Sequence, residues 1–365
     1  MSRSFSIYLD LLRFVAACLV VVYHSNSRLI VESVLPLSSY GHSAVIVFFV
    51  LSGYVIAYAT DAKEQGARVY WASRLSRVWS LALPAVLLTP VLDVVGQSLA
   101  PALYAGNTTE GHALLRVFTS LAFLNEIWFI SIMSFSNIAY WSLKYEVWYY
   151  LLFALYAFGG KRWRWPLLGL AMLLVGPKIL LLAPIWVLGV VIYRWRRMQD
   201  ISEWMGWLCL ASSVVLFAAF EHYQVTEVFS AWLKAAIGPY WHRQLTFSKW
   251  FLSDYLLAGI VFLNFVGMRR VIFRFNEALY RVEKPVRMLA GFTLSIYLLH
   301  QPLIYFYAAL IDLPPAGYLR YTAVMVCVVA TIFAIGSVTE RKRFALRRWL
   351  LALSGPKAVP QRVAP

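Results

Sequence analysis

Three ionisable side chains share one face of the first apolar segment. The segment Leu9–His24 reads LDLLRFVAACLVVVYH and carries Asp10, Arg13 and His24. A helix turns about 100° per residue, so Arg13 and His24 differ by about 20° around its axis, and Asp10 falls on the same stripe. Such groups are costly in lipid and usually face a protein interior or a watered cavity. The stripe is our first candidate site, with His24 suited to general-base chemistry near neutral pH.

A plainer interpretation of this stripe also exists. Arg13 would extend to the lipid headgroups, and His24 would cap the helix at the outer interface. The presence of all three groups on one face favours the functional interpretation over this one.

A glutamate lies about one turn into a second apolar segment, YWSLKYEVWYYLLFAL. On a helix, Ser142 and Tyr150 share a face with Glu146 at i−4 and i+4. A carboxylate at that depth needs a cation, a hydroxyl cluster or a proton. A structural ion pair with Lys144, Arg13 or another helix is as well supported here as a catalytic role.

Near the end of the chain, SIYLLHQPL places a second histidine in an apolar segment. His300 lies roughly 18 Å from the inner end of its predicted helix, close to the depth of His24. We therefore expect the two histidines at one level, where they could line one cavity. Pro302 is expected to kink the helix and to free nearby carbonyl groups.

The segment RVYWASRLSRVW supplies a group of arginines. Arg74 and Arg77 share a helical face, with Arg68 a turn and a half earlier. Paired guanidiniums suit phosphate, although anchoring of a cytoplasmic loop would explain them too. Upstream, FFVLSGYVIAY contains Ser52-Gly53, which we interpret as a helix-packing pair rather than a nucleophile.

The elements that must position these residues are membrane helices. Hydrophobic residues make up 61% of the 365 residues, charged residues 14%, and the mean hydropathy is +0.67. Several apolar runs reach the roughly 17–25 residues that cross a bilayer. The three cysteines lie in apolar runs, so we expect neither a disulfide framework nor a metal site.

The pattern predicts an all-α, polytopic bundle of ten spans with both termini cytoplasmic. Most of the 33 Lys and Arg residues then fall in inner segments, so the net charge of +16 reflects membrane topology rather than nucleic-acid binding. Residues 1–340 form the membrane domain and 341–365 a basic tail. Residues 114–133 are apolar enough to span but are expected to lie on or dip into the outer face. The predicted helices are 7–24, 43–60, 78–99, 140–158, 166–175, 179–193, 205–220, 251–266, 288–311 and 318–337.

Taken in order, these motifs resemble the membrane-bound acyltransferase 3 family, which includes O-acetyltransferases of bacterial surface polysaccharides. The likeness runs from LDLLRFVAACLVVVYH to SIYLLHQPL, most of the chain. The family's arginine–ten residues–histidine pattern falls on Arg13 and His24. Its cytoplasmic arginine–two residues–arginine pattern falls on Arg74 and Arg77, and its WSL…E pattern on 141–143 and Glu146.

The resemblance implies acyl transfer, with acetyl as the default group, from cytoplasmic acyl-CoA to a hydroxyl of a surface polysaccharide or a small molecule, in the inner membrane of a bacterium. It implies catalytic roles for His24, Arg13 and Glu146, with or without an acyl-histidine relay. Arg68, Arg74 and Arg77 would bind CoA phosphates. The acceptor side would involve His300, Ser142, Tyr150 and Asp10, the last also fixing Arg13. No partner other than the acceptor and the bilayer is implied, and the oligomeric state stays open.

Two other functional classes compete with an enzyme. In a secondary transporter or flippase, Arg13, His24, Glu146 and His300 would form a proton or substrate relay, although we find no repeated half with matching broken helices. A non-catalytic membrane scaffold would leave the ionisable stripe unexplained.

Overall fold

The fold is a helical bundle throughout its described parts. The computed structural model describes residues 1–64, 66–106, 111–195, 200–353 and 355. Within these ranges every regular element is a helix, apart from an isolated bridge between Ser134 and Asn137. The predicted all-α polytopic class is confirmed.

Most of the helices follow one another with short connections. In chain order they are α1 Arg3–Ser25, α2 Gly41–Ala62, α3 Ala67–Leu99, α4 Pro101–Tyr104, α5 Ala113–Leu121, α6 Trp141–Phe158, α7 Arg164–Val175, α8 Pro177–Arg194, α9 Glu203–His222, α10 Val225–Gln244, α11 Phe251–Val271, α12 Asn276–Gly291, α13 Thr293–Leu310 and α14 Leu319–Leu353.

Within the described ranges, seven helical segments are long and apolar enough to cross a membrane. The 18-residue helices α6 and α13 are not among them, although both lie in the bundle. At 12 residues, α7 is only about 18 Å long, short of a hydrocarbon core of about 30 Å. The count of ten spans and the cytoplasmic placement of both termini stay predictions.

Several predicted boundaries were wrong. The sequence indicated no helix at α10 or α12, and it joined the end of α12 to α13 as one helix over 288–311, which the structure breaks at Phe292. The sequence NEALYRVEKPVRMLAG of α12 is amphipathic, so a search for apolar runs passes over it. α14 continues past the predicted end at Ser337 to Leu353. Of the predicted tail at 341–365, residues 354 and 356–365 lie outside the described residues, and the division into membrane domain and tail stays a prediction.

Residues 114–133 do not form a spanning helix. α5 has nine residues, and the chain then runs irregularly to α6. Asn125 and Glu126 are fully buried by protein. Asn125 Nδ2 donates to the carbonyl of Ile132 at 2.9 Å, and Lys178 Nζ lies 2.7 Å from Glu126 Oε2. Protein groups, rather than lipid, therefore surround this polar pair.

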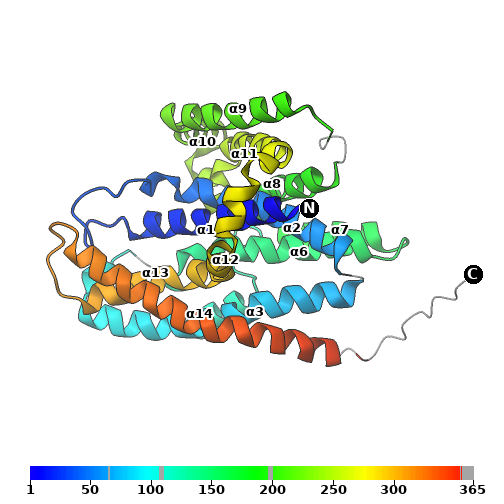
Figure 1. The fold of residues 1–365 in the computed structure, drawn as a ribbon. Coiled ribbons are helices and arrows are strands. Elements are labelled where there is room, and N and C mark those ends of the chain that lie inside the picture. The colour runs from blue at the N-terminus through cyan, green and yellow to red at the C-terminus, as the bar shows by residue number, and fades with distance from the viewer. Residues whose placement is uncertain (65, 107–110, 196–199, 354, 356–365) are drawn as a thin grey trace, which may run out of the picture.

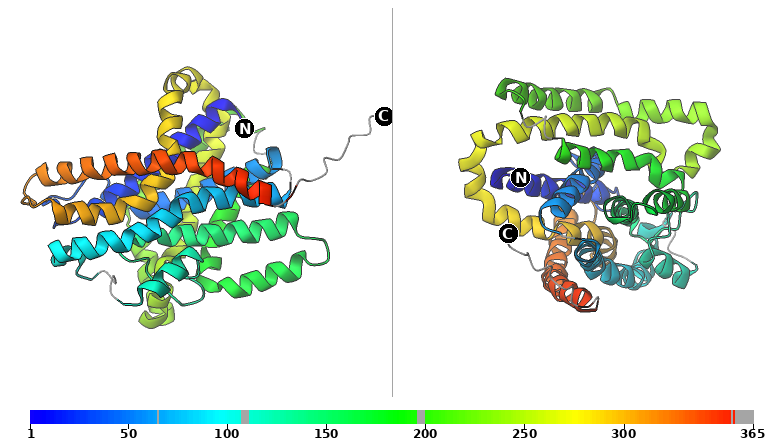
Figure 2. Two further views of the ribbon diagram at one scale, coloured as in Figure 1. Left: turned by 90° about the horizontal axis from the view of Figure 1, so that it is seen from below. Right: turned by 90° about the vertical axis from the view of Figure 1, so that its right-hand side faces the viewer.

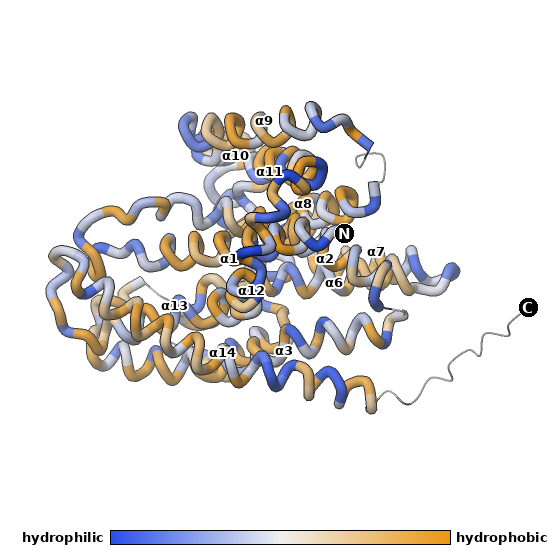
Figure 3. Tube along the Cα trace, in the orientation of Figure 1, coloured by the Kyte–Doolittle hydropathy of each residue, from blue (hydrophilic) through white to orange (hydrophobic). Residues whose placement is uncertain are grey.

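The helices are arranged around a centre formed by α1, α2, α3, α6 and α13. In Figure 1 the C-terminal ends of α2, α6 and α14 lie toward the same side of the molecule, on the right. Hydrophilic segments mark that end of α3, α7 and α14 in Figure 3. In the right-hand view of Figure 2, α9 to α11 lie along one edge and α14 along the opposite edge. The polar residues predicted to do chemistry come from helices of the centre.

Two glycines allow α2 and α8 to touch backbone to backbone. A Cβ added to Gly53 would lie 1.9 Å from the carbonyl oxygen of Trp186, and one added to Gly189 would lie 2.0 Å from that of Val50. The packing role predicted for the pair Ser52-Gly53 is confirmed for Gly53, whereas Ser52 donates a hydrogen bond to Glu146. The contact brings Ser52 and Trp186 into the same layer of the bundle.

We expect Gly53→Ala to lower the free energy of unfolding by about 1–3 kcal/mol, because the methyl group must push α2 from α8. Thermal unfolding of the purified protein measures this. Gly169→Ala on α7 is the control, since a Cβ there meets nothing within 4 Å; there the change should be neutral or stabilising. Equal stability of Gly53→Ala and wild type would contradict the close contact.

Candidate functional site

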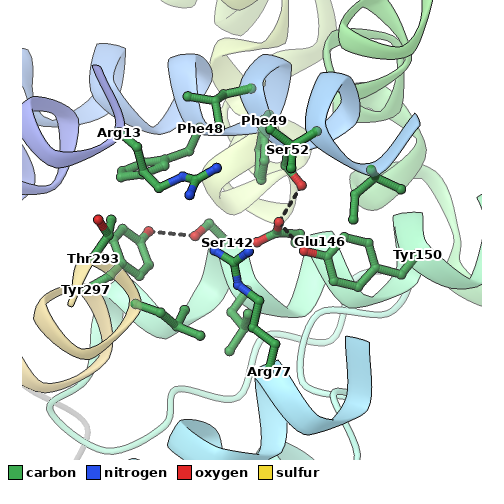
Figure 4. Close-up of a pocket in the computed structure, with 15 residues that line it drawn as sticks. Arg13, Phe48, Phe49, Ser52, Arg77, Ser142, Glu146, Tyr150, Thr293 and Tyr297 are labelled. Atoms are coloured by element: carbon green, nitrogen blue, oxygen red, sulfur yellow. Dashed lines mark hydrogen bonds between the residues drawn. The ribbon is translucent and has the colours of Figure 1, made fainter. Parts of the chain in front are cut away.

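A polar cavity of about 660 Å³ lies at the centre of the bundle. Five helices contribute to its wall: α1, α2, α3, α6 and α13. Figure 4 shows the guanidinium groups of Arg13 and Arg77 entering it from opposite sides, with that of Arg77 pointing toward Ser142 and Glu146. The cavity thus gathers two cations, a carboxylate and several hydroxyl groups in a largely apolar surround.

The stripe on α1 is partly held by an ion-pair chain. Arg13 Nη1 lies 3.5 Å from Asp10 Oδ1, and Arg287 Nη1 of α12 lies 3.0 Å from the other carboxylate oxygen of Asp10. The side chain of Arg13 is 14% exposed, so it does not extend into solvent. Asp10 therefore contacts Arg13, and it also contacts a second arginine that the sequence did not indicate.

Glu146 is held by hydroxyl groups. Ser52 and Tyr150 both donate to its Oε1, and Trp186 Nε1 donates to Ser52 Oγ at 3.1 Å. Of the partners foreseen for this carboxylate, the hydroxyl cluster is the one that the structure provides. The contact of Tyr150 follows from its i+4 spacing, whereas that of Ser52 depends on the packing of α2 against α6.

Ser142 points to a tyrosine of α13. Its Oγ lies 2.5 Å from the hydroxyl oxygen of Tyr297, and both side chains are buried (Figure 4). Tyr297 lies one turn before His300 in the motif SIYLLHQPL, so its spacing on the same helical face was the available signal for a role that the sequence reading missed.

The two histidines, which the sequence predicted at one depth, are neighbours in the structure. The ring centroids of His24 and His300 are 5.2 Å apart, at 47° to each other. His300 is fully buried, and its Nδ1 donates to the carbonyl of Ile296 at 2.9 Å. In the neutral ring its Nε2 is then the unprotonated nitrogen, and that atom has no hydrogen-bond partner among the described residues.

Tyr297 connects the histidine pair to the cavity. Its ring lies 6.2 Å from that of His300, while its hydroxyl contacts Ser142 in the cavity wall. Neither histidine lines the cavity itself. Along α1, His24 is about 16 Å from Arg13 at 1.5 Å per residue. The site thus has an arginine and carboxylate part and a histidine part, with Tyr297 between them.

A proline and a loop fix the backbone beside His300. Pro302 has no N–H, so the carbonyl of Leu298 lacks its usual helical donor. Asn137 Nδ2 donates to that carbonyl at 2.8 Å. One residue before the proline, Gln301 Oε1 accepts from the backbone N–H of Ala139 at 2.9 Å. The freed carbonyl expected at Pro302 therefore has a partner, which the sequence could not identify.

The three arginines proposed to bind phosphate have different surroundings. Arg77 lines the cavity. Arg74 is buried in an ion pair with Glu64 at 2.6 Å and lies over the ring of Tyr70. Arg68 donates to the backbone carbonyl of Leu351. The structure brings Arg77 together with Arg13 and Glu146 but places the other two outside the cavity wall.

A histidine–aspartate pair joins α2 to α11 outside this cavity, with Asp254 buried and His42 partly exposed. His42 Nε2 lies 2.7 Å from Asp254 Oδ1, and the ring of Trp250 is 4.8 Å from that of His42. The sequence reading did not single out these residues, because no motif joins positions so distant in the chain.

We expect Asn137→Ala to cost about 1–3 kcal/mol of stability, since it leaves a buried carbonyl unpaired. In a Pro302→Ala background the new N–H at 302 can serve Leu298, so the cost of Asn137→Ala should fall well below 1 kcal/mol. A double-mutant cycle by thermal unfolding measures this coupling. Additive costs would contradict the assigned hydrogen bond.

Comparison with known proteins adds the family. A family model described as an acyltransferase domain, that of the acyltransferase 3 family, matches residues 6–338. Neither the search of curated proteins nor that of solved structures found a match. The matched range includes every residue that lines the cavity and both histidines. The chain belongs to the acyltransferase 3 family and is a membrane acyltransferase.

Proposed function

We propose that this acyltransferase moves an acetyl group from acetyl-CoA to a hydroxyl group of an acceptor on the far side of the membrane. The observation that carries the proposal is the two-part site: a cationic cavity, and a histidine pair joined to it by Tyr297. A donor with several phosphates suits the first part, and proton removal from a hydroxyl suits the second.

The donor is assigned to the arginine part because of its charge. CoA carries phosphate groups that guanidinium groups bind through paired, charge-assisted hydrogen bonds. Arg77 is half-buried at the cavity, and Arg13 faces it from α1. Arg13, about 16 Å from His24 along α1, would orient the arm of the donor so that its thioester reaches the histidines. Arg74 and Arg68, which contact Glu64 and the carbonyl of Leu351, would then stabilise the surrounding structure rather than contact the donor.

His24 is assigned as the general base. It would take the proton from the acceptor hydroxyl as the oxygen bonds to the thioester carbon. The carbon–sulfur bond then breaks, and the proton passes from His24 to the leaving thiolate. His300, with its free Nε2 near His24, would orient that ring or hold the acceptor. Glu146, held by Ser52 and Tyr150, would hold the donor arm on its way from the arginines to the histidines.

The acceptor and the setting are assigned from the family. The acceptor is proposed to be a sugar hydroxyl of a surface or exported polysaccharide, and the membrane the inner membrane of a bacterium. Arg68, Arg164 and Arg194 lie where α3 and α7 begin and α8 ends, which is the cationic end of the bundle. Both assignments fit a donor site near this end and a histidine pair further along α1.

We expect His24→Ala to abolish transfer of label from [acetyl-14C]acetyl-CoA to polysaccharide acceptors, because the hydroxyl would lose its base. Release of free CoA by the purified protein gives a second readout. His222→Ala on α9 is the control, since that histidine is exposed and far along the chain from the site. Full activity of a folded His24→Ala protein would exclude it as the base.

Substitutions of Arg77 and Arg74 should have different effects, the first on donor binding and the second on stability. We expect Arg77→Gln to raise the KM for acetyl-CoA roughly tenfold or more, because at least one charge-assisted contact with a CoA phosphate is lost. The stability of the protein should stay unchanged. Arg74→Gln should instead lower stability by about 3 kcal/mol, because Glu64 is left buried without its cation. An unchanged KM in Arg77→Gln, with the protein folded, would remove Arg77 from the donor site.

A further inference from the structure

A large apolar groove lies on the outside of the bundle between α6, α7 and α8. Its empty volume is about 1310 Å³, about twice that of the polar cavity. On α6 the wall is a stripe of Tyr149, Leu152, Phe153 and Tyr156, spaced to one helical face. None of the roles proposed above uses this groove.

The length of the groove matches one leaflet of a bilayer. On α8 its wall runs from Leu180 to Arg194, about 21 Å at 1.5 Å per residue. One leaflet, headgroups included, is about 20–22 Å thick. Within this length the lining is aliphatic or aromatic except at the Arg194 end.

The Arg194 end is cationic and aromatic. The guanidinium of Arg194 lies 5.6 Å from the ring centroid of Phe153, and that of Arg164 lies 5.9 Å from the ring centroid of Tyr156. Asp61, 3.1 Å from Arg194, supplies one carboxylate against these two cations. Trp195 adds an exposed ring of the kind that settles at headgroup level. This end therefore suits the phosphate of a lipid rather than more hydrocarbon.

The inner wall of the groove reaches the polar cavity. Trp186 lines the groove and is itself 2% exposed. Its indole N–H donates to Ser52, which donates to Glu146. A hydrocarbon chain in the groove would thus rest against the residue that supports the carboxylate of the candidate active site.

We propose that this groove is a binding site for one anionic glycerophospholipid of the leaflet at the cationic end of the bundle. An acyl chain lies along α6 and α8, with the phosphate between Arg194 and Arg164. The length of the groove matches a lipid of one leaflet, and the positive charge at one end favours an anionic headgroup. A zwitterionic lipid would bring its own ammonium group to the same two cations, and a lipid without phosphate would gain the apolar contacts alone.

The test is native mass spectrometry of the purified full-length protein titrated with phosphatidylglycerol or phosphatidylcholine in detergent. We expect one phosphatidylglycerol to be retained at roughly tenfold or more lower concentration than phosphatidylcholine. Arg164→Gln with Arg194→Gln should remove that preference. Ala183→Trp, which fills the groove, should abolish retention, whereas Ala211→Trp on the exposed face of α9 should leave it unchanged.

Should Ala183→Trp not fold, Val187→Trp tests the same groove from its exposed side. Equal retention of the two lipids by wild type would overturn the charge-based assignment. Retention of phosphatidylglycerol by a folded groove-filling variant at the wild-type level would overturn the location. Both results are independent of whether acetyl-CoA is the donor, because no turnover is measured.

Discussion

The arrangement of the bundle depends on satisfying a carboxylate in its centre. Glu146 accepts hydrogen bonds from Ser52 and Tyr150, and Ser52 is in turn held by Trp186. A buried polar group without such partners costs several kcal/mol in an apolar medium. Meeting that cost requires α2, α6 and α8 to pack closely, and the close approach at Gly53 makes this possible. The cavity beside Glu146 is a consequence of that packing.

The helices that surround the cavity determine which side chains form the two parts of the site. α3 brings Arg77 and α1 brings Arg13 to the cavity, while α13 brings Tyr297 to Ser142. One turn further along α13, His300 meets His24 at the far end of α1. The arrangement gives the proposed transfer a direction, from phosphates at the arginines to a hydroxyl at the histidines.

Features internal to one helix could be predicted from the sequence. The Asp10, Arg13 and His24 stripe, and the contact of Tyr150 with Glu146, follow from helical periodicity alone. The matching depths of His24 and His300 were also predictable, because depth along a span is a count of residues. The sequence likewise indicated the class of the fold through its apolar runs.

Contacts between helices could not be predicted in this way. Nothing local shows that Glu64 pairs with Arg74, or that Asn137 serves the carbonyl freed by Pro302. The amphipathic α12, which brings Arg287 to Asp10, has too few apolar residues for a search for spans. Such contacts depend on helix adjacency, which a single sequence does not encode in any local pattern.

The direction of transfer can be tested most directly with the protein in sealed proteoliposomes of one orientation. Acetyl-CoA is confined to the side that the cationic helix ends face, and a polysaccharide acceptor to the other side. If the arginines hold the donor and the histidines the acceptor, label should cross to the acceptor in this arrangement, and not when the two compartments are exchanged. Transfer with both substrates confined to one compartment, or equal transfer after exchange, would contradict the two-part site.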